Sequence, residues 1–367
     1  MSRPRRVHVI GTGLMGTSVA LALRRGGVEV SLEDADPGHL RLAVSLGAGT
    51  PVDETARPDR PDQAPDLVIV GVPPVALGAV IAEALERYPH AVVTDLGSVK
   101  AAVLADVSAR APRWLDRYVG GHPMAGSEQS GPLAARADLF DGRAWAVTPH
   151  PRSRPEAVEM VEALARLCGA LVVRMSSTEH DEAVALVSHV PQVASSVVAG
   201  LLTTASEGQL ALAGQGLRDV TRIAAGDPNL WSQILSANAG PVARLLHEAA
   251  ESLHRVAVAL EKGETSEYGS REVRRFLERG VSGVRRLPGK HGKRPETFVS
   301  VPVLLPDRPG ELARLFADVS AAGINIEDVR IDHSPGAPAG LVQLAVHPDA
   351  VSPLLEALAR HGWDVHR

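Results

Sequence analysis

A glycine-rich turn between a short apolar run and a helical pattern places the strongest constraint on how this chain folds. Residues 6–10 are rich in β-branched side chains and predict a strand, and Gly11, Gly13 and Gly16 follow at once as G-x-G-x-x-G. The first glycine permits a tight turn, the second lets a pyrophosphate approach the backbone, and the third lets the following helix pack closely on the strand. The N-terminus of that helix then faces the phosphate charge. The turn therefore predicts the first βα unit of a dinucleotide-binding Rossmann fold.

An acidic residue indicates which dinucleotide binds. Asp34 comes directly after the second predicted strand, residues 28–32, and no arginine follows it. A carboxylate at this position accepts both ribose hydroxyls of NAD and repels the 2′-phosphate of NADP, so we expect NAD as the cofactor. The candidate cofactor-binding residues are Gly11, Thr12, Gly13, Leu14, Met15, Gly16, Asp34, Val72 and Pro73.

The pattern of strands and helices divides the chain into three parts, as its 367 residues lead one to expect. Strands alternate with helices through residues 1–176, which predicts an α/β domain with a doubly wound parallel sheet. Residues 177–287 carry almost no strand signal and predict an all-α domain, whose long helices include 178–206, 216–226 and 228–262. Residues 288–296 form a Gly-, Pro- and base-rich linker, and residues 297–367 read βαββαβ, a ferredoxin-like domain.

Composition excludes several classes of protein. The net charge of −5 argues against a nucleic-acid binder, and one cysteine, with no Cys/His cluster at zinc-ligand spacing, predicts no metal site. The apolar stretch 183–205 carries His189, Pro191 and Gln192, which a membrane span tolerates poorly, so a buried helix is expected there. The basic N-terminus is broken by the glycine turn and is not expected to be a signal peptide. We therefore expect a soluble cytoplasmic protein, with no membrane partner and enough apolar helix surface to form a homodimer.

Two segments lie where ligands bind in a doubly wound sheet, beyond the carboxyl ends of predicted strands. They are residues 95–100 and 120–131. His122 stands between glycine and proline, so it does not belong to the buried face of a helix. An imidazole beside a nicotinamide is suited to accept a hydroxyl proton as hydride leaves the same carbon. His122 is therefore a catalytic candidate, and Ser98 is a second one that holds either the ring or the nicotinamide amide.

The helical domain supplies candidates for substrate binding. Asp219 and Arg222 stand three residues apart on one predicted helix, either as a surface ion pair or with the guanidinium capturing a substrate carboxylate. The glycines and apolar residues around Arg222 favour the second interpretation. His189 is either a substrate contact or a satisfied interior histidine, and Trp231 is either packing or a ligand contact.

Three runs resemble one family closely. They are HPMAGSEQSG at 122–131, GLRDVTRI at 216–223 and SHVPQ at 188–192. Together they resemble the prephenate/arogenate dehydrogenase family of tyrosine biosynthesis, over nearly the whole chain. The resemblance implies a Rossmann domain, a helical dimerisation domain and a C-terminal ACT domain. One departure is Gln192, where many relatives carry a second histidine.

The resemblance implies an NAD-dependent prephenate dehydrogenase, which oxidatively decarboxylates prephenate to 4-hydroxyphenylpyruvate. His122 would accept the C4-hydroxyl proton, and Ser98 would orient the histidine. Arg222 would bind a substrate carboxylate in a geometry set by Asp219, and Glu128 would gate the pocket. The substrate-binding candidates are Arg222, Asp219, His189, Gln192, Glu128, Ser127 and Trp231.

The C-terminal domain carries an ACT-like signature, and such domains bind amino acids between paired copies. The resemblance implies feedback regulation, with tyrosine as the expected regulatory ligand, whereas the alternative is a purely structural tail. The candidate regulatory residues are Asp307, Arg308, Pro309, Gly310, Asn325 and Ile326.

The substrate's side chain stays open, because prephenate carries a keto group where arogenate carries an amine. Gln192 replaces a ring with a neutral amide, so arogenate and a 4-amino analogue remain alternatives to prephenate. A different class is an ACT-bearing amino-acid sensor with a vestigial nucleotide domain. The intact glycine turn, Asp34 and His122 argue against that class.

Overall fold

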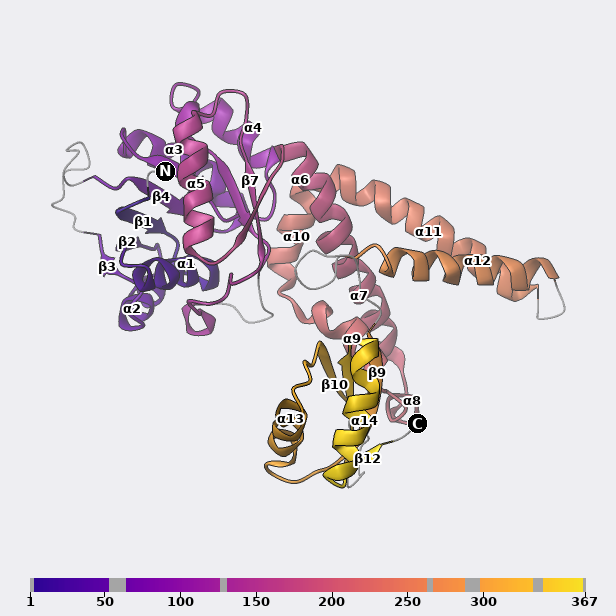
Figure 1. The fold of residues 1–367 in the computed structure, drawn as a ribbon. Coiled ribbons are helices and arrows are strands. Elements are labelled where there is room, and N and C mark those ends of the chain that lie inside the picture. Colours follow the sequence, from indigo (N-terminus) through magenta and orange to yellow (C-terminus); the bar gives the residue numbers. More distant parts are fainter. Residues whose placement is uncertain are drawn as a thin grey trace. The chain divides into compact units, whose positions relative to one another are not determined.

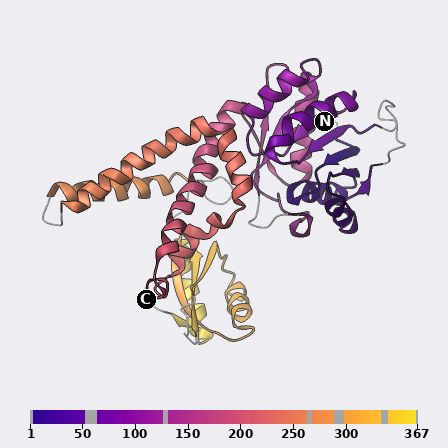
Figure 2. The ribbon, with the colours of Figure 1, turned by 180° about the vertical axis from the view of Figure 1, so that it is seen from behind.

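The computed structural model describes most of the chain, namely residues 3–52, 64–125, 131–262, 267–287, 298–332 and 339–365. The chain divides into two compact units. One consists of Met1–Ala205 and Val220–Ala249, and the other of Ser206–Asp219 and Ala250–Arg367. Figures 1 and 2 show the ribbon from opposite sides.

The first unit opens with a five-stranded parallel sheet in the order β3-β2-β1-β4-β5 (Figure 1). Both faces of the sheet are buried: on β4, Leu67 and Ile69 belong to one apolar cluster, and Val68 and Val70 belong to another. A sheet buried on both faces is the doubly wound arrangement predicted from the sequence. The elements are β1 (Arg6–Ile10), α1 (Leu14–Arg25), β2 (Glu29–Glu33), α2 (Pro37–Ser45), β3 (Thr50–Pro51), β4 (Leu67–Val70), α3 (Pro74–Arg87), β5 (Val92–Asp95) and α4 (Ala101–Arg110).

The strand register brings the candidate residues to one edge of this sheet. Ile10 at the end of β1 pairs with Glu33 on one side and with Val70 on the other, and Val70 pairs with Asp95. The glycine turn, Asp34 and residues 95–100 all follow these strand ends. They therefore lie along the carboxyl edge, where doubly wound sheets bind ligands.

A second, three-stranded sheet corrects the expectation of a wholly parallel domain. β6 (Gly120–Pro123) pairs antiparallel with β7 (Ala144–Thr148), which pairs parallel with β8 (Leu171–Arg174). A parallel bridge between Val93 and Tyr118 links the two sheets, so β6 runs in the direction of β5 and ends at the same edge. Helix α5 (Pro155–Leu167) connects β7 to β8.

The helices of the first unit are more interrupted than the sequence predicts. The predicted helix 178–206 consists of α6 (Ser177–Val184), a π-helical turn (Ala185–His189) and α7 (Val190–Leu201). Because Pro191 has no N–H to donate within a helix, a wider turn just before it relieves the backbone locally.

The predicted helix 228–262 is also broken, at Asn238, between α10 (Pro228–Ala237) and α11 (Ala239–Glu261). Asn238 is 3% exposed, which is low for an amide side chain. A buried amide needs hydrogen-bond partners, so the side chain of Asn238 is expected to bond to other residues at this break.

The second unit includes the end of α11 and a four-stranded antiparallel sheet in the order β10-β11-β9-β12. Strand, helix, strand, strand, helix, strand is the βαββαβ order predicted for the C-terminal residues. The predicted linker 288–296 lies outside the described residues. The elements are α8 (Glu207–Leu210), α9 (Gln215–Thr221), α12 (Glu267–Val284), β9 (Val299–Pro306), α13 (Glu311–Ala321), β10 (Asp328–Asp332), β11 (Ala339–Val346), α14 (Val351–Arg360) and β12 (Asp364–Val365).

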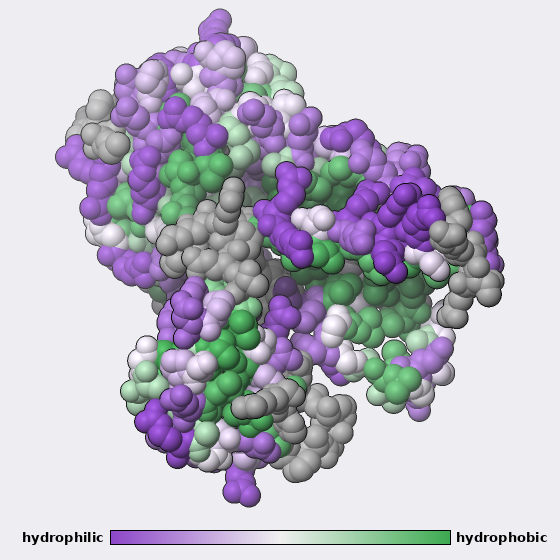
Figure 3. Space-filling model, turned by 45° about the vertical axis from the view of Figure 1, so that its right-hand side comes forward, coloured by the Kyte–Doolittle hydropathy of each residue, from purple (hydrophilic) through white to green (hydrophobic). Residues whose placement is uncertain are grey.

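The helical run Ser177–Thr204 is, in the described residues, the one helix long and apolar enough to cross a membrane by length and composition. Its interior face is polar, since His180, Asp181 and His189 are buried on it. Its outer face is apolar: Leu186, Val187, Val197 and Leu201 are 58–71% exposed. Figure 3 shows hydrophobic residues gathered on the helical part of the molecule. Such a surface is typical of an interface between protein chains.

Candidate active site

The three glycines of the first turn have the three structural roles that the motif predicts. Gly11 has a φ of +95°, and a Cβ atom there would lie 2.6 Å from the carbonyl oxygen of Gly71. A Cβ atom on Gly16 would lie 1.9 Å from the carbonyl oxygen of Gly11, so the helix can approach the turn only without a side chain. A Cβ atom on Gly13 would meet nothing within 4 Å. Gly13 thus borders open space where a ligand can approach.

The start of α1 suits an anion. Its N-cap, Gly13, provides no side-chain hydrogen bond, and the first turn contains no acidic residue. The N–H groups of that turn therefore remain available for a pyrophosphate. Asp34 stands beside the turn, where its Oδ2 accepts hydrogen bonds from the Thr12 backbone N–H at 2.5 Å and the Thr12 hydroxyl at 2.8 Å. These features fit a dinucleotide bound at this turn, with Asp34 close beside it.

His122, near the end of β6, belongs to a buried line of hydrogen-bonded side chains. Its Nδ1 lies 2.8 Å from Nε2 of His180 on α6, and His180 Nδ1 lies 2.8 Å from Oδ1 of Asp181. His122 is 9% exposed, and His180 and Asp181 are 1% and 4% exposed. We call His122 and His180 the histidine pair.

The carboxylate of Asp181 is anchored at the N-terminus of α4. Its Oδ1 accepts the Lys100 backbone N–H at 2.8 Å, and its Oδ2 accepts the Ala101 backbone N–H at 2.9 Å. Helix N-termini favour negative charge. The histidine pair therefore ends on a carboxylate that is fixed in place.

The anchored carboxylate determines the tautomer of both rings. An ionised carboxylate only accepts hydrogen bonds, so His180 Nδ1 carries the proton and His180 Nε2 is left as an acceptor. His122 must then donate from Nδ1, which leaves a lone pair on its Nε2. Burial, followed by the nearby His180, Lys100 and His189, holds the pKa of His122 well below its usual range. His122 is therefore a neutral ring that presents a lone pair at Nε2.

A second buried cluster fixes the backbone around His122. The ammonium of Lys100 is bonded to the carboxylate of Asp95 and donates to the carbonyl oxygen of Gly121 at 2.9 Å. The Tyr118 hydroxyl donates to Asp95 Oδ1 at 2.9 Å. Burial and the Asp95 charge raise the pKa of Tyr118 well above its usual value, so the phenol stays protonated. The cluster ties the end of β5 to β6 and holds His122 in position.

His189, at the end of the π-helical turn, has the opposite hydrogen-bonding arrangement. The side-chain amide nitrogen of Asn238 lies 2.7 Å from the carbonyl oxygen of Asp181 and 3.1 Å from Nδ1 of His189. The carbonyl requires a donor, so the NH2 group of Asn238 donates one hydrogen to it and the other to Nδ1 of His189, which accepts. His189 therefore carries its proton on Nε2. Trp231 lies edge-on to this ring, with centroids 6.2 Å apart.

Three further predicted substrate residues, Gln192, Arg222 and Asp219, lie within the described residues. Gln192 is buried on α7, and Ser195, one turn further, is buried with no hydrogen-bond partner for its hydroxyl in the described part of the chain. Arg222 is exposed at the start of a 3₁₀ turn, Arg222–Ala225, that packs against α7. Asp219 accepts a hydrogen bond from the Gln215 side chain at 2.8 Å.

Asp219 lies on α9 (Gln215–Thr221), and Arg222 begins the 3₁₀ turn that directly follows it, so their common helix face stays a prediction. The helical run ends at Ala225, before Gly226 and Pro228, which do not continue a helix. Ser127 and Glu128, both predicted to bind substrate, lie outside the described residues.

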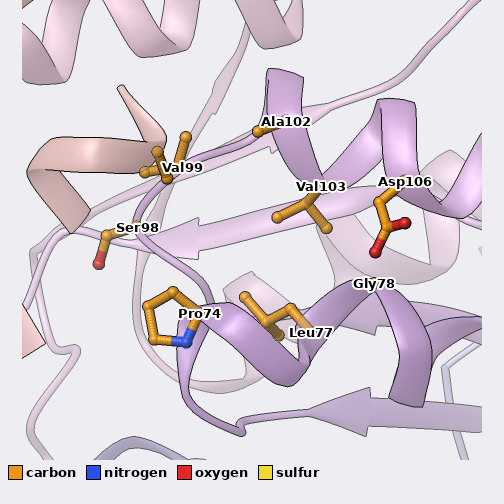
Figure 4. A pocket seen from close by; sticks show the side chains of 9 residues that line it. Pro74, Leu77, Gly78, Ser98, Val99, Ala102, Val103 and Asp106 are labelled. Carbon is orange, nitrogen blue, oxygen red and sulfur yellow. The ribbon is translucent and has the colours of Figure 1, made fainter. Parts of the chain in front are cut away.

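Ser98 is predicted either to orient the ring of His122 or to hold the nicotinamide amide. It lines a pocket between α3 and α4, and Figure 4 shows it at one end of that pocket, away from Asp106. No hydrogen bond joins Ser98 to His122 in the residues that the structure describes. The ring is held at Nδ1 by His180 instead.

Sequence reasoning placed His180 near the helix face of His189 but gave no role to three residues of this network: His180, Asp181 and Asn238. An adjacent His-Asp pair near the start of an apolar helix was a signal for the first two, since charged groups are seldom buried without partners. No local pattern marks Asn238, which acts through side-chain contacts with residues about fifty positions earlier.

Two family models match this chain in succession. The nucleotide-binding domain of prephenate dehydrogenase matches residues 19–174, and the dimerization domain of prephenate dehydrogenase matches residues 176–272. The probable prephenate dehydrogenase NovF of Streptomyces niveus is 38% identical over 366 residues, which cover 98% of this chain and 99% of that protein. The prephenate dehydrogenase of Bacillus subtilis is 28% identical, over 94% of this chain and 92% of its own.

A solved structure agrees with these matches. The prephenate dehydrogenase from A. aeolicus, in complex with hydroxyphenyl propionate and NAD+, superposes with a TM-score of 0.66. It is 28% identical and covers 76% of this chain and 97% of its own. The two successive family matches, together covering more than half of the residues, carry the assignment. This chain belongs to the prephenate dehydrogenase family.

Proposed function

We propose that this protein catalyses the oxidative decarboxylation of prephenate to 4-hydroxyphenylpyruvate in tyrosine biosynthesis. It is an NAD-dependent dehydrogenase, and NAD+ supplies the hydride acceptor when bound. The single observation that carries the proposal is the neutral, buried His122, which presents a lone pair at the carboxyl edge of a dinucleotide-binding sheet. The full-length similarity to NovF supports the choice of substrate.

His122 Nε2 accepts the proton of the substrate's C4 hydroxyl as hydride leaves C4. The bond to the ring carboxylate then breaks and CO2 leaves, which gives a phenolate. The phenolate takes the proton back, because a phenol is a weaker acid than an imidazolium. Protons therefore balance over the cycle. The protein's task is to position the hydroxyl and polarise its O–H bond.

The side chains around His189 are suited to the substrate's oxygen atoms. The Nε2–H of His189 is a donor for a keto or carboxylate oxygen of the substrate, and Gln192 is buried on α7 one turn away. We assign Arg222 to a substrate carboxylate, with Asp219, Trp231, Ser127 and Glu128 as further substrate-binding residues. Ser98 is assigned to the nicotinamide or to the far side of the His122 ring.

Steady-state NADH production with prephenate and arogenate, measured side by side, tests the substrate. We expect kcat/KM to be higher with prephenate. A clear preference for arogenate, or for a 4-amino analogue, would contradict this assignment. If no NADH forms from prephenate, arogenate or the 4-amino analogue, the result would favour the alternative of an ACT-bearing amino-acid sensor.

The domain division is proposed as residues 1–176, 177–287 and 297–367, joined by a linker at 288–296, in a cytoplasmic homodimer. The dimerization-domain match and the exposed apolar face of α7 support a dimer.

We assign the C-terminal domain to the ACT class, with tyrosine as its regulatory ligand. Its signature residues Asp307–Gly310 form an exposed turn before α13, and Asn325 is exposed after it. These positions suit a ligand that binds between paired domains.

Truncation after Leu287 tests the regulatory assignment. An active dimer that no longer responds to tyrosine is expected, because the module that would bind tyrosine is then absent. Inhibition of the truncated enzyme with the full-length midpoint would place tyrosine at the active site. Absence of tyrosine binding to the full-length protein by calorimetry would contradict the regulatory role.

A further inference from the structure

The histidine pair does more than orient one ring. Resting on the proposed function, we propose that His180 is a second proton acceptor: it takes the Nδ1 proton of His122 when His122 Nε2 accepts the proton of the substrate hydroxyl. His180 does not touch the substrate in this scheme, so it is a positioning and proton-holding residue.

The geometry allows the transfer directly. The two ring nitrogens are 2.8 Å apart, a normal hydrogen-bond distance, and the rings cross at 67° with centroids 5.0 Å apart. Both side chains are more than nine-tenths buried. A proton on Nδ1 of His122 therefore has a protein nitrogen as its immediate partner.

The charges on the surrounding elements favour the far ring for a positive charge. His122 faces the Lys100 ammonium at the start of α4 and His189 on the π-helical turn, and both oppose its protonation. Asp95 at the end of β5 is already bonded to Lys100 and Tyr118. His180 instead contacts the Asp181 carboxylate at 2.8 Å. Strand β7, which packs against α6, contributes no titratable side chain.

The step balances in protons. The O–H bond of the substrate breaks and an N–H bond forms at Nε2 of His122. The Nδ1–H bond of His122 breaks and an N–H bond forms at Nε2 of His180. The positive charge then lies beside Asp181, and both transfers reverse when the phenolate product takes its proton back. No oxidant or reductant is involved.

His180→Gln tests the proposal, because its amide oxygen accepts a hydrogen bond from His122 but cannot bind the proton. We expect kcat to fall about 100-fold, near the low end of a general-base effect. We also expect the acid limb of the kcat/KM profile to move to lower pH, because the remaining His122 is harder to protonate. NADH binding and the melting temperature check that the variant is folded.

His8→Gln is the matched control. His8 is equally buried and also contacts a carboxylate, with its Nε2 3.1 Å from Glu33. It lies outside the histidine pair, so the acid limb should stay in place. A loss of kcat in His180→Gln with an unmoved acid limb would overturn the proposal, since it would show orientation alone. Wild-type kcat would overturn it as well.

A measurement on the wild-type protein covers the case in which His180→Gln does not fold. Ring ¹⁵N spectra recorded as the pH falls should place the first proton taken up by the pair on His180. If that proton rests on His122, the proposal is wrong. Its failure is distinct from failure of the proposed function, which predicts that His122→Asn lowers kcat for NADH production from prephenate by roughly 10²–10⁴-fold.

Discussion

His122 and His189 lie in one buried network, and their Nε2 atoms have opposite hydrogen-bonding roles. His122 is bonded through His180 to the side-chain carboxylate of Asp181 and keeps a lone pair on Nε2. His189 is bonded through the amide of Asn238 to the main-chain carbonyl of the same Asp181 and keeps a proton on Nε2. One residue therefore sets one ring as a base and the other as a donor.

This difference shows that a buried histidine acts as a base or as a donor according to the group that ends its chain of hydrogen bonds. A ring that accepts at one nitrogen donates at the other, so each intervening imidazole passes on the requirement of the group behind it. The carboxylate demands a donor at each step along the histidine pair. The Asn238 amide donates to both neighbours and so reverses the outcome for His189. A base and a donor can thus coexist around one substrate.

The largest effect is expected from removing the base. His122→Asn should lower kcat by roughly 10²–10⁴-fold, the usual contribution of a general base, while the fold and NAD binding persist. Stopped-flow or steady-state NADH production measures the loss. An effect below tenfold would remove His122 from the catalytic step.

His150→Asn is the control for that variant. Its ring is part-buried and bonded to the carbonyl oxygens of Leu115 and Tyr118, and burial also lowers its pKa. His150 follows β7, which runs antiparallel to β6, so it lies at the opposite edge of the sheet. We expect lower stability and an unchanged kcat.

A smaller effect on catalysis is expected from removing Asn238, which fixes His189 as a hydrogen-bond donor. Asn238→Ala leaves the carbonyl of Asp181 and Nδ1 of His189 without their shared donor, which costs about 1–3 kcal/mol of stability. Because His189 is then free to change tautomer, KM for prephenate should rise roughly tenfold, the effect of about 1.4 kcal/mol, with a smaller change in kcat.

Ser232→Ala is the control for the Asn238 variant. Ser232 is exposed on the same helix, α10, and its hydroxyl donates to the backbone of Asn229. Its KM for prephenate should match that of the wild type. An unchanged KM in Asn238→Ala would mean that His189 does not contact the substrate.

The smallest effect on the chemical step is expected at the glycine turn, where Gly13→Ala and Gly16→Ala form a matched pair. A methyl group on Gly13 meets no protein atom, so stability should hold while the Kd for NAD rises. A methyl group on Gly16 would overlap the Gly11 carbonyl, so stability itself should fall. Calorimetric binding and thermal melts separate the two. Equal NAD affinity in Gly13→Ala and the wild type would contradict the placement of the pyrophosphate.

The two parts of the site differ in how far the sequence predicts them. The glycine turn, β1 and the position of Asp34 are confirmed, because they depend on backbone geometry within some thirty residues. His122 was selected for a local reason as well, its place between glycine and proline after a strand. The regulatory and substrate-binding assignments remain predictions.

The partners of His122 and His189 were not identified because side chains far apart in the sequence determine which residues meet. His180 and Asp181 meet His122 and α4 across about 60 and 80 residues. The break at Asn238 and the π-helical turn before Val190 are likewise set by packing and buried polar contacts, which periodicity does not encode. Helix α2 was overlooked although its start signal is local and present in the sequence: Asp36 caps the helix and Pro37 begins it.

The tautomers of the two histidines test the account most directly. In the wild-type protein at neutral pH, ¹⁵N spectra of the imidazole nitrogens should show His122 protonated at Nδ1 and bare at Nε2. They should show His189 protonated at Nε2 and bare at Nδ1. A proton on Nε2 of His122, or the same tautomer on both rings, would contradict the claim that Asp181 sets one ring as a base and the other as a donor.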